Sequence, residues 1–492
     1  MIALLLILIP LLTGIIAFFI KNEKSIRSWA LFSSVITLLV SLLGLTVFDK
    51  EQYLYHQSEW LGMFRASFSL QLDGMGQVLC LLTAVSYPLV IIATWKNIYR
   101  KSHNFFALML LAQAGLMGVF LAMDALLFYF FWELALIPMY FLCSQWGGER
   151  RIPVTFKFFI YTFVGSVLML VGIIFIYSHT KDHSFAISSF YEAQLSYSQQ
   201  SFLFWFFFAA FAIKMPIFPF HTWQPDTYEQ SPTATTMILS GVMVKMGVLG
   251  LLRWTLPVLP VASYSWGDVA TSIAVAGMIY ASLIAIRQDS IKRLIAYSSI
   301  AHMGLMCAAV FAENKIGIQG VMIQMFNHGI NIIGLWIIAE MIEKQFGTRK
   351  ISELSGLAQK APAMAIFFVV IALANIGLPL TNAFVGEFMM FTGIFGSAVT
   401  QYYVAFTVLA GISIILAAIY MLNMVRKVFY GNTNAITETG SDIKMNEKLA
   451  LGIIVALILW MGIYPNSLLN LTSEISENIL IKSDITTLID KQ

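Results

Sequence analysis

The chain has 492 residues, of which 59% are hydrophobic and 11% are charged, and its formal net charge is +3. Because an ordinary soluble domain carries roughly 25% charged residues, this composition excludes a water-soluble globular protein. Apolar runs long enough for a helix to cross a hydrocarbon core about 30 Å thick recur from end to end. The sequence therefore predicts one all-α polytopic membrane bundle over residues 1–492.

The apolar runs, taken in chain order, predict 14 transmembrane helices. They cover residues 2–20, 28–47, 76–95, 105–123, 125–146, 154–178, 202–222, 231–253, 268–286, 292–312, 316–341, 361–398, 403–425 and 448–464. The first run is not a secretory signal, because no basic residue precedes it and Lys21, Lys24 and Arg27 follow it. A channel-bearing core over about residues 105–425 is expected, with flanking helices in 1–104 and 426–492.

The basic residues favour one side of the predicted membrane topology. The odd-numbered loops hold 20 lysines and arginines and the even-numbered loops hold 5, while Lys482 and Lys491 lie in the tail. Basic residues near span ends accumulate on the cytoplasmic side, so the odd-numbered loops are expected there and both termini outside the cytoplasm. The two basic residues left inside spans are Lys214 and Lys245.

Four isolated ionisable residues lie near the middle of predicted spans: Glu133, Lys214, Lys245 and Glu387. A lysine at a helix centre costs about 2.5–3.5 kcal/mol on insertion scales, and such groups commonly mark ion pathways. Burial disfavours the charged form of each group, so each could exchange a proton. The alternative is that Glu133 and Lys214 form a structural ion pair that only fastens two helices together.

Two of the predicted spans contain residues that interrupt a helix. Pro216 and Pro219 follow Lys214, and Gly377 and Pro379 precede the buried acid of the twelfth span. Proline removes a backbone donor and breaks a helix. Paired interrupted helices beside buried charges are typical of transporters built from structural repeats, and inverted antiporter-like repeats are expected.

Histidines offer intermediate positions for a proton. His302 lies in the tenth span, and Gln324, His328 and Asn331 fall at i, i+4 and i+7 on one face of the eleventh. Histidine can accept or release a proton near neutral pH. The alternative is that each histidine only fixes helix contacts, but their place in the chain between the second buried lysine and the last buried glutamate favours a polar relay.

The sequence contains no pattern for a redox cofactor. Cys80, Cys143 and Cys307 are scattered without a C-x-x-C pair, and no dinucleotide fingerprint or phosphate-binding loop occurs. His179 and His183 fall in a loop with no further ligands nearby. No metal and no cofactor is therefore expected in this chain.

Several motifs, in order along nearly the whole chain, carry a family resemblance. They are DALLFYFFWELALIPMYF, KMPIFPFHTWQPDTYEQSPT, VMVKMGVLGLLR, DSIKRLIAYSSIAHMG and NAFVGEFMMF. Together they resemble the chain M family of antiporter-like membrane subunits in bacterial NADH:quinone oxidoreductase, respiratory complex I. The resemblance implies a proton-translocating subunit of the membrane arm in the bacterial inner membrane, next to other antiporter-like chains and with no nucleic-acid partner. NADH, flavin, iron–sulfur clusters and quinone would be handled by partner subunits.

The resemblance also implies roles for individual residues. Glu133 resembles the family's fifth-span glutamate, Lys214 its seventh-span lysine and Lys245 its eighth-span lysine. Glu387 resembles the terminal acid of the twelfth span, where sister chains commonly carry lysine. The run LPLTNAF replaces the family's usual Pro-Gly-Thr run near the second break, and Asn331 stands where a small residue is frequent. These departures concern the local backbone at the break and leave the ionisable residues in place.

Two other classes of protein remain open from the sequence. A subunit of a multisubunit cation/proton antiporter or of a membrane-bound hydrogenase would share nearly every motif. A structural scaffold or passive channel would need neither titratable lysines nor broken helices.

Overall fold

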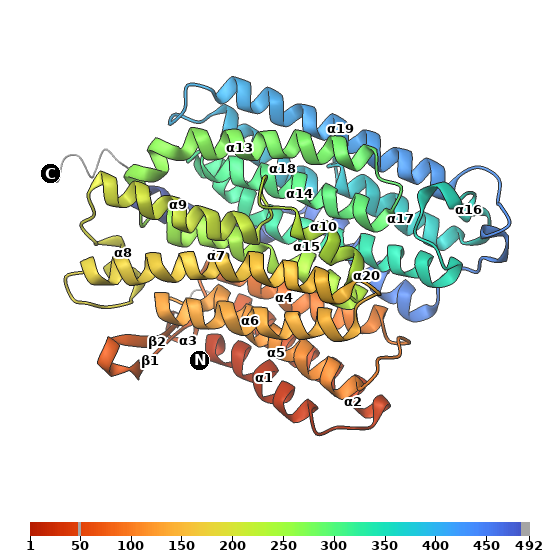
Figure 1. Cartoon of the computed structure of the whole chain (residues 1–492), viewed down its shortest axis with the longest axis horizontal. Helices are drawn as coiled ribbons and strands as arrows, with labels where there is room; N and C mark the ends of the chain where they lie inside the picture. Colours follow the sequence, from red (N-terminus) through yellow and green to blue (C-terminus); the bar gives the residue numbers. More distant parts are fainter. Residues whose placement is uncertain (48–50, 484–492) are drawn as a thin grey trace.

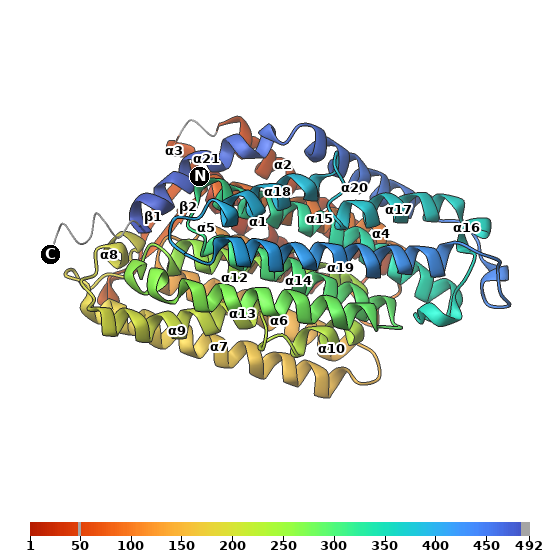
Figure 2. The same ribbon diagram turned by 90° about the horizontal axis from the view of Figure 1, so that it is seen from above.

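The computed structural model describes residues 1–47 and 51–483, so that Lys50 and Lys491 of the charge count lie outside the described residues. Long helices lie side by side along one common axis (Figures 1 and 2). The predicted helical membrane bundle is confirmed. Burying every backbone polar group within helices is what permits such a chain to cross hydrocarbon.

Within the described ranges, 11 helical segments are long and apolar enough to span a membrane. They are α2 (Glu23–Thr46), α4 (Gly74–Ala93), α5 (Ser102–Leu121), α6 (Ala125–Trp146), α7 (Arg151–His179), the continuous segment α11 to η3 (Thr233–Thr255), α13 (Pro260–Ile286), α14 (Ile291–Val310), α15 (Lys315–Phe346), α19 (Tyr403–Phe429) and α20 (Met445–Ile463). Further apolar helices are α1 (Ile2–Ala17), α9 (Tyr197–Lys214), α17 (Pro362–Asn375) and α18 (Asn382–Phe395). The count of 14 spans stays a prediction.

The remaining elements are short or lie at the ends of the bundle. They are α3 (Glu51–Leu54), α8 (Ile187–Tyr191), α10 (Trp223–Gln230), α16 (Leu357–Lys360), α21 (Asn466–Ser483), and the 3-10 helices η1 (Gly62–Phe64), η4 (Ile351–Glu353) and η5 (Thr437–Thr439). The strands β1 (Tyr55–Leu61) and β2 (Ala66–Gln71) form an antiparallel hairpin in which Tyr55 faces Gln71. The hairpin and α21 are not predicted from the sequence, because both lie outside the apolar runs.

The loops alternate between the two ends of the bundle as the topology requires. Ser290 and Lys350, from the ninth and eleventh loops, form a bridge at one end. Asp124 and Ala186, from the fourth and sixth connections, form a bridge at the other end, next to the hairpin (Figure 1). The ninth and eleventh loops therefore share one end and the fourth and sixth connections share the other, while the side of the membrane on which each end lies stays a prediction.

The centre of the bundle is formed by α15 and the α11–η3 segment, in which every residue of the most apolar stretch is buried. In α2, α7, α19 and α20, only 28–39% of the residues of that stretch are buried. A helix that is apolar on every side belongs in an interior. The outer helices expose apolar side chains, as expected of a surface that meets lipid.

The location of one basic residue differs from the sequence-based expectation. Arg253 counts with an even-numbered loop in the predicted topology, but it lies inside the helical segment and is 3% exposed. Its guanidinium contacts Asp73 Oδ2 at 2.6 Å and donates to the Phe120 carbonyl at 2.8 Å. No local pattern reveals this pair, because 180 residues separate Arg253 from Asp73.

Close helix contacts depend on glycine at a few positions. A Cβ added to Gly115 of α5 would lie 2.5 Å from the Ala135 backbone nitrogen of α6. Small residues let helices approach closely in lipid, where the hydrophobic effect does not drive helices together. Gly411 of α19 differs, because a Cβ added there would have no described atom within 4 Å.

We expect Gly115→Ala to destabilise the subunit by about 1–3 kcal/mol, the usual cost of overpacking a filled interior. Gly411→Ala is the matched control and should change the stability little. The measurement is thermal unfolding of the purified complex in mild detergent. Equal midpoints for the two variants would show that the contact between α5 and α6 tolerates separation.

Candidate functional site

The first predicted helix break lies directly after Lys214, where α9 ends. Met215 N–H donates to the Phe211 carbonyl, and Ile217 N–H to the Ala212 carbonyl, both at 2.8 Å. The next helix, α10, begins at Trp223, whose indole nitrogen donates to the Ile213 carbonyl at 3.0 Å. The carbonyls freed by the break are thus satisfied by protein, as hydrocarbon requires.

Lys214 has no polar partner held in contact among the described residues. Its side chain is buried, and its ammonium makes no hydrogen bond or ion pair with the part of the chain that the structure describes. The nitrogen lies 5.3 Å from the centre of the Trp132 ring, at the range of a cation–π contact. Glu133 attracts it electrostatically, but Oε1 of Glu133 is buried without a hydrogen bond to any described residue. The alternative of a closed Glu133–Lys214 ion pair is therefore not what this structure contains.

Lys245 follows a π-helical segment, η2 (Leu239–Met243), that the sequence did not reveal. There, the Val244 N–H donates to the carbonyl of Leu239, five residues earlier, at 3.3 Å. The Lys245 ammonium donates to the Ser240 carbonyl at 2.9 Å. π-bulges occur frequently at functional sites, and this one turns a fully buried lysine toward α15.

Lys245 begins a row of four ionisable side chains. Its Nζ lies 2.8 Å from His328 Nδ1. The rings of His328 and His302 have their centres 5.5 Å apart, and His302 Nδ1 lies 3.3 Å from Glu387 Oε1. The structure therefore brings together Lys245, His328, His302 and Glu387, from four different helices, with the histidines between the lysine and the glutamate as the sequence indicates.

The second predicted break separates α17 from α18 at residues 376–381, and Glu387 lies one turn into α18. Gln324 Nε2 donates to Glu387 Oε1 at 3.3 Å. Gly377 adopts φ +70°, and a Cβ there would clash with Glu387 Oε2. Glycine is thus favoured beside the carboxylate for its backbone conformation, and a side chain at this position would displace the Glu387 carboxylate.

Neutral amides hold the second break in place. Asn327 Nδ2 donates to the Asn382 carbonyl at 2.8 Å, and Asn382 Nδ2 donates to the Asn327 carbonyl at 3.4 Å. This reciprocal pair is not predicted from the sequence, where the helix face pointed instead to Asn331, whose Oδ1 is buried without a hydrogen bond to any described residue. The sequence does contain a signal for this pair: Asn327 directly precedes His328, and Asn382 directly follows the break.

Hydroxyl groups surround the approach to Glu387. Ser298 Oγ accepts from Asn375 Nδ2 at 3.1 Å and from Tyr420 at 3.0 Å. A cavity of about 20 Å³ between Tyr420, His302 and Glu387 exceeds the roughly 10–15 Å³ that one water needs. The environment of Glu387 can therefore include a hydrogen-bonding solvent molecule.

The six candidate residues fall into two groups. Lys214 and Glu133 form one, and the row from Lys245 to Glu387 forms the other. No hydrogen bond or ion pair within the described ranges links Lys214 to Lys245. A proton passing between the groups would require water or a movement of side chains.

No group of three or more histidine, cysteine, aspartate or glutamate residues that could hold a metal ion occurs in residues 1–47 and 51–483. Cys80, Cys143 and Cys307 are buried and unbridged. The sequence predicts His179 in a loop, but the structure places it at the end of α7. There its Nδ1 lies 2.9 Å from the Phe175 carbonyl oxygen. The arrangement is suited to moving protons between titratable side chains.

Comparisons with known proteins match both the sequence and the fold. The family model for the NADH:quinone oxidoreductase/Mrp antiporter transmembrane region matches residues 122–413. NADH-quinone oxidoreductase subunit M of Rickettsia prowazekii (strain Madrid E) is 37% identical over 97% of this chain and 98% of that protein. Subunit M of Rhodobacter capsulatus is 37% identical over 90% of this chain and 88% of its own.

Two solved structures resemble the chain over nearly its full length. A chain of respiratory complex I from Thermus thermophilus with bound NADH has a TM-score of 0.89 at 26% identity, covering 98% of this chain and 100% of that chain. A chain of the Mrp complex from Dietzia sp. DQ12-45-1b has a TM-score of 0.86 at 20% identity, covering 99% and 98%. The second likeness concerns the fold alone.

We expect Lys245→Met to shift the infrared imidazole band of His328, because the donor 2.8 Å from Nδ1 is lost. The band is assigned by its absence in His328→Asn. Lys315→Met is the control, since Lys315 lies on the same helix as His328 but pairs with Glu477. An unshifted band in Lys245→Met would contradict the contact.

Proposed function

Because the chain belongs to the NADH:quinone oxidoreductase/Mrp antiporter membrane family and is an antiporter-like membrane-arm subunit of respiratory complex I, we propose that it translocates protons through its buried ionisable residues. The complex is an enzyme that oxidises NADH and reduces quinone. This chain would contribute proton transport to that enzyme, alongside neighbouring antiporter-like subunits, and the redox cofactors would reside in partner subunits.

The observation that supports the proposal most directly is the row Lys245, His328, His302 and Glu387. The Lys245–His328 contact of 2.8 Å is within reach for proton transfer, and the His302–Glu387 contact of 3.3 Å lies just beyond that range and would shorten slightly. The two imidazoles, 5.5 Å apart between ring centres, would exchange a proton after a ring rotation or through a water. Lys245 would supply the proton, the histidines would pass it on, and Glu387 would release it.

Lys214 and Glu133 would act before this row. A lysine with no fixed hydrogen-bond acceptor can change its protonation state without breaking a contact first. A proton leaving Lys214 would weaken the attraction to Glu133 and allow the carboxylate to turn away. Moving one charge against 100 mV costs about 2.3 kcal/mol, which redox chemistry elsewhere in the complex would supply.

The charge distribution supports a direction for transport. With the odd-numbered loops in the cytoplasm, α18 runs from the second break toward the opposite side, so Glu387 would be the exit. Both termini would then lie on the periplasmic side of the bacterial inner membrane. The channel-bearing core would span about residues 105–425, within the flanking helices.

A cation/proton exchanger subunit is the second candidate, because the fold of a Mrp complex chain matches this chain nearly as well. The relationship to subunit M over 97% of the chain favours complex I. Affinity purification separates the two: NADH- and quinone-handling chains would copurify in the first case, and exchanger subunits in the second.

We expect Lys214→Arg to assemble normally and to lose most proton translocation per NADH oxidised, because a barrier raised by about 1.4 kcal/mol already slows the proton step roughly tenfold. Arginine keeps the positive charge but does not release its proton at biological pH. The measurement is proton uptake per NADH oxidised by the complex reconstituted in vesicles. Lys315→Arg, in an exposed ion pair, is the control, and an unchanged ratio for Lys214→Arg would make Lys214 a structural counter-ion.

We expect Glu387→Gln to reduce the same ratio while leaving assembly intact. Glutamine keeps the shape and can still contact Gln324, but it cannot ionise. The variant complex should retain its subunit composition and should pump fewer protons per electron. Normal pumping by the assembled variant would place the exit elsewhere.

A further inference from the structure

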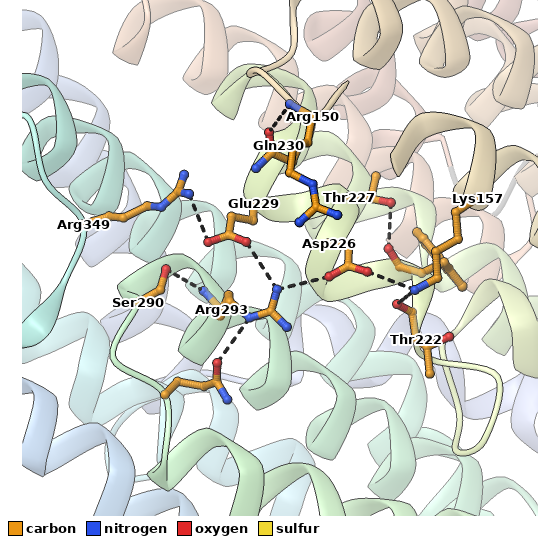
Figure 3. Close-up of polar contacts among 12 residues, drawn as sticks. Arg150, Lys157, Thr222, Asp226, Thr227, Glu229, Gln230, Ser290, Arg293 and Arg349 are labelled. Atoms are coloured by element: carbon orange, nitrogen blue, oxygen red, sulfur yellow. Dashed lines mark hydrogen bonds and ion pairs between the residues drawn. The ribbon is translucent and has the colours of Figure 1, made fainter. Parts of the chain in front are cut away.

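The short helix α10 carries two carboxylates that bind basic residues of other helices (Figure 3). Asp226 contacts Lys157 of α7 at 2.9 Å and Arg293 of α14 at 3.1 Å. Glu229 contacts the same Arg293 nitrogen at 3.2 Å and Arg349 at 3.1 Å. One guanidinium nitrogen of Arg293 therefore joins both acids of α10 to α14.

The row of alternating charges continues to the central helix. Arg349 also contacts Glu343 of α15 at 3.4 Å, and Lys292 of α14 contacts Glu343 at 2.5 Å. Seven charged residues thus link α7, α10, α14 and α15, together with the loop that carries Arg349. We call this set, from Lys157 through Asp226, Arg293, Glu229, Arg349 and Glu343 to Lys292, the charge network.

The charge network joins the two groups of candidate relay residues. α10 follows the break after Lys214, and Lys157 also donates to the Thr222 carbonyl within that break at 2.8 Å. α14 carries His302, and α15 carries His328. Arg293 is consequently an ionic link between the helix that follows the Lys214 break and the helix that carries His302.

The buried face of α10 also packs against the bundle, with the Trp223 ring centre 5.0 Å from that of Phe158 and the Tyr228 ring centre 5.9 Å from that of Trp336. The helix is only eight residues long, its N-cap residue makes no side-chain hydrogen bond to the helix backbone, and nonhelical residues precede it. Isolated helices of this length do not form in water, so the orientation of α10 depends on tertiary contacts. Both ion pairs of α10 with α14 converge on Arg293, so that loss of this one side chain removes both.

The two helix breaks differ in the polar contacts that attach them to the bundle. Asp226 and Arg293 are partly exposed, at 34% and 28%, and a cavity of about 720 Å³ opens beside Glu229, Glu343 and Arg349. Solvent and salt ions reach such charges and screen them. The buried amides of Asn327 and Asn382 at the second break carry no net charge and are not screened in this way.

We propose that Arg293 is a positioning residue for proton transfer: it fixes α10, and with it the Lys214 break, against the helix that carries His302. This inference rests on the proposed proton-translocating function. Single exposed ion pairs contribute little to stability, but networks with shared partners contribute more. Arg293 acts through α10 and does not itself carry the proton.

The test compares Arg293→Gln, Arg293→Lys and Lys350→Gln in the complete complex. Arg293→Lys keeps a positive charge that can reach both acids. Lys350→Gln is the matched control, because Lys350 pairs with Glu353 at 2.8 Å in the same end of the bundle without linking helices. The measurements are amide hydrogen exchange of residues 223–230 and protons translocated per NADH oxidised.

We expect Arg293→Gln to raise amide exchange in α10 roughly tenfold, because both carboxylates of α10 lose their contact with α14 at once and local opening becomes easier. The number of protons translocated per NADH oxidised should fall in the same variant. In Arg293→Lys, both the amide exchange and this number should be close to those of the parent complex. In the parent complex, raising the ionic strength from roughly 0.01 to 0.15 M should increase exchange in α10 but not in the first turn of α18. Lys350→Gln should match the parent.

Three results would overturn the inference. Exchange in α10 could stay unchanged in Arg293→Gln, it could rise while the proton ratio stays normal, or the ratio could fall without a change in exchange. If Arg293→Gln does not assemble, Glu229→Gln replaces it, since it removes one of the two contacts and leaves the Asp226 contact intact. Normal ratios in Lys214→Arg and Glu387→Gln would instead refute the proposed function, whereas the exchange measurement is independent of pumping.

Discussion

The structure depends on one constraint: inside hydrocarbon, each backbone polar group and each charge must find its partner within the protein. Helices meet this constraint by themselves, and so the outer helices α2, α7 and α19 are continuous. Nonhelical backbone occurs between α9 and α10 and between α17 and α18, where Trp223 and the Asn327–Asn382 pair satisfy the freed groups. The same interior holds Lys245, His328 and Glu387, which have polar partners there. Lys214, beside the first break, is the exception, since it has no hydrogen bond to a described residue.

The two groups of ionisable residues differ in how firmly they are held. Lys245 has fixed partners on both sides, in Ser240 and His328, and the row to Glu387 is nearly closed by direct contacts. Lys214 has an aromatic ring and an electrostatic attraction to Glu133, with no hydrogen bond to the residues described. Under the proposed function, a proton would follow the fixed row along one path, whereas a side chain without fixed contacts can change its partner. The change of state that the proposal requires would then take place at Lys214.

The two breaks also differ in how they are attached to the bundle. The first is attached by partly exposed charges that meet at Arg293 in addition to the buried side chains of α10, and the second is attached in the interior by amides. An attachment through charges is strengthened or weakened by ionic strength and by neighbouring charges, while an amide pair responds to neither to a comparable degree. The first break is for this reason the more adjustable of the two, and it is the one that adjoins the loosely held lysine.

The sequence by itself determined the membrane class, the positions of both breaks, the alternation of the loops and the identity of the ionisable residues. These features follow from local chemistry: apolar runs, proline and glycine, and charges where charges are costly. Only the tertiary structure decided which residues meet. It placed His328 against Lys245, left Glu133 and Lys214 without a closed ion pair, buried Arg253 with Asp73, and formed the β1–β2 hairpin and the charge network. Such contacts join residues far apart in the chain, and they depend on helix rotation, on π-helical turns and on packing at glycines such as Gly115, none of which is encoded in a local pattern.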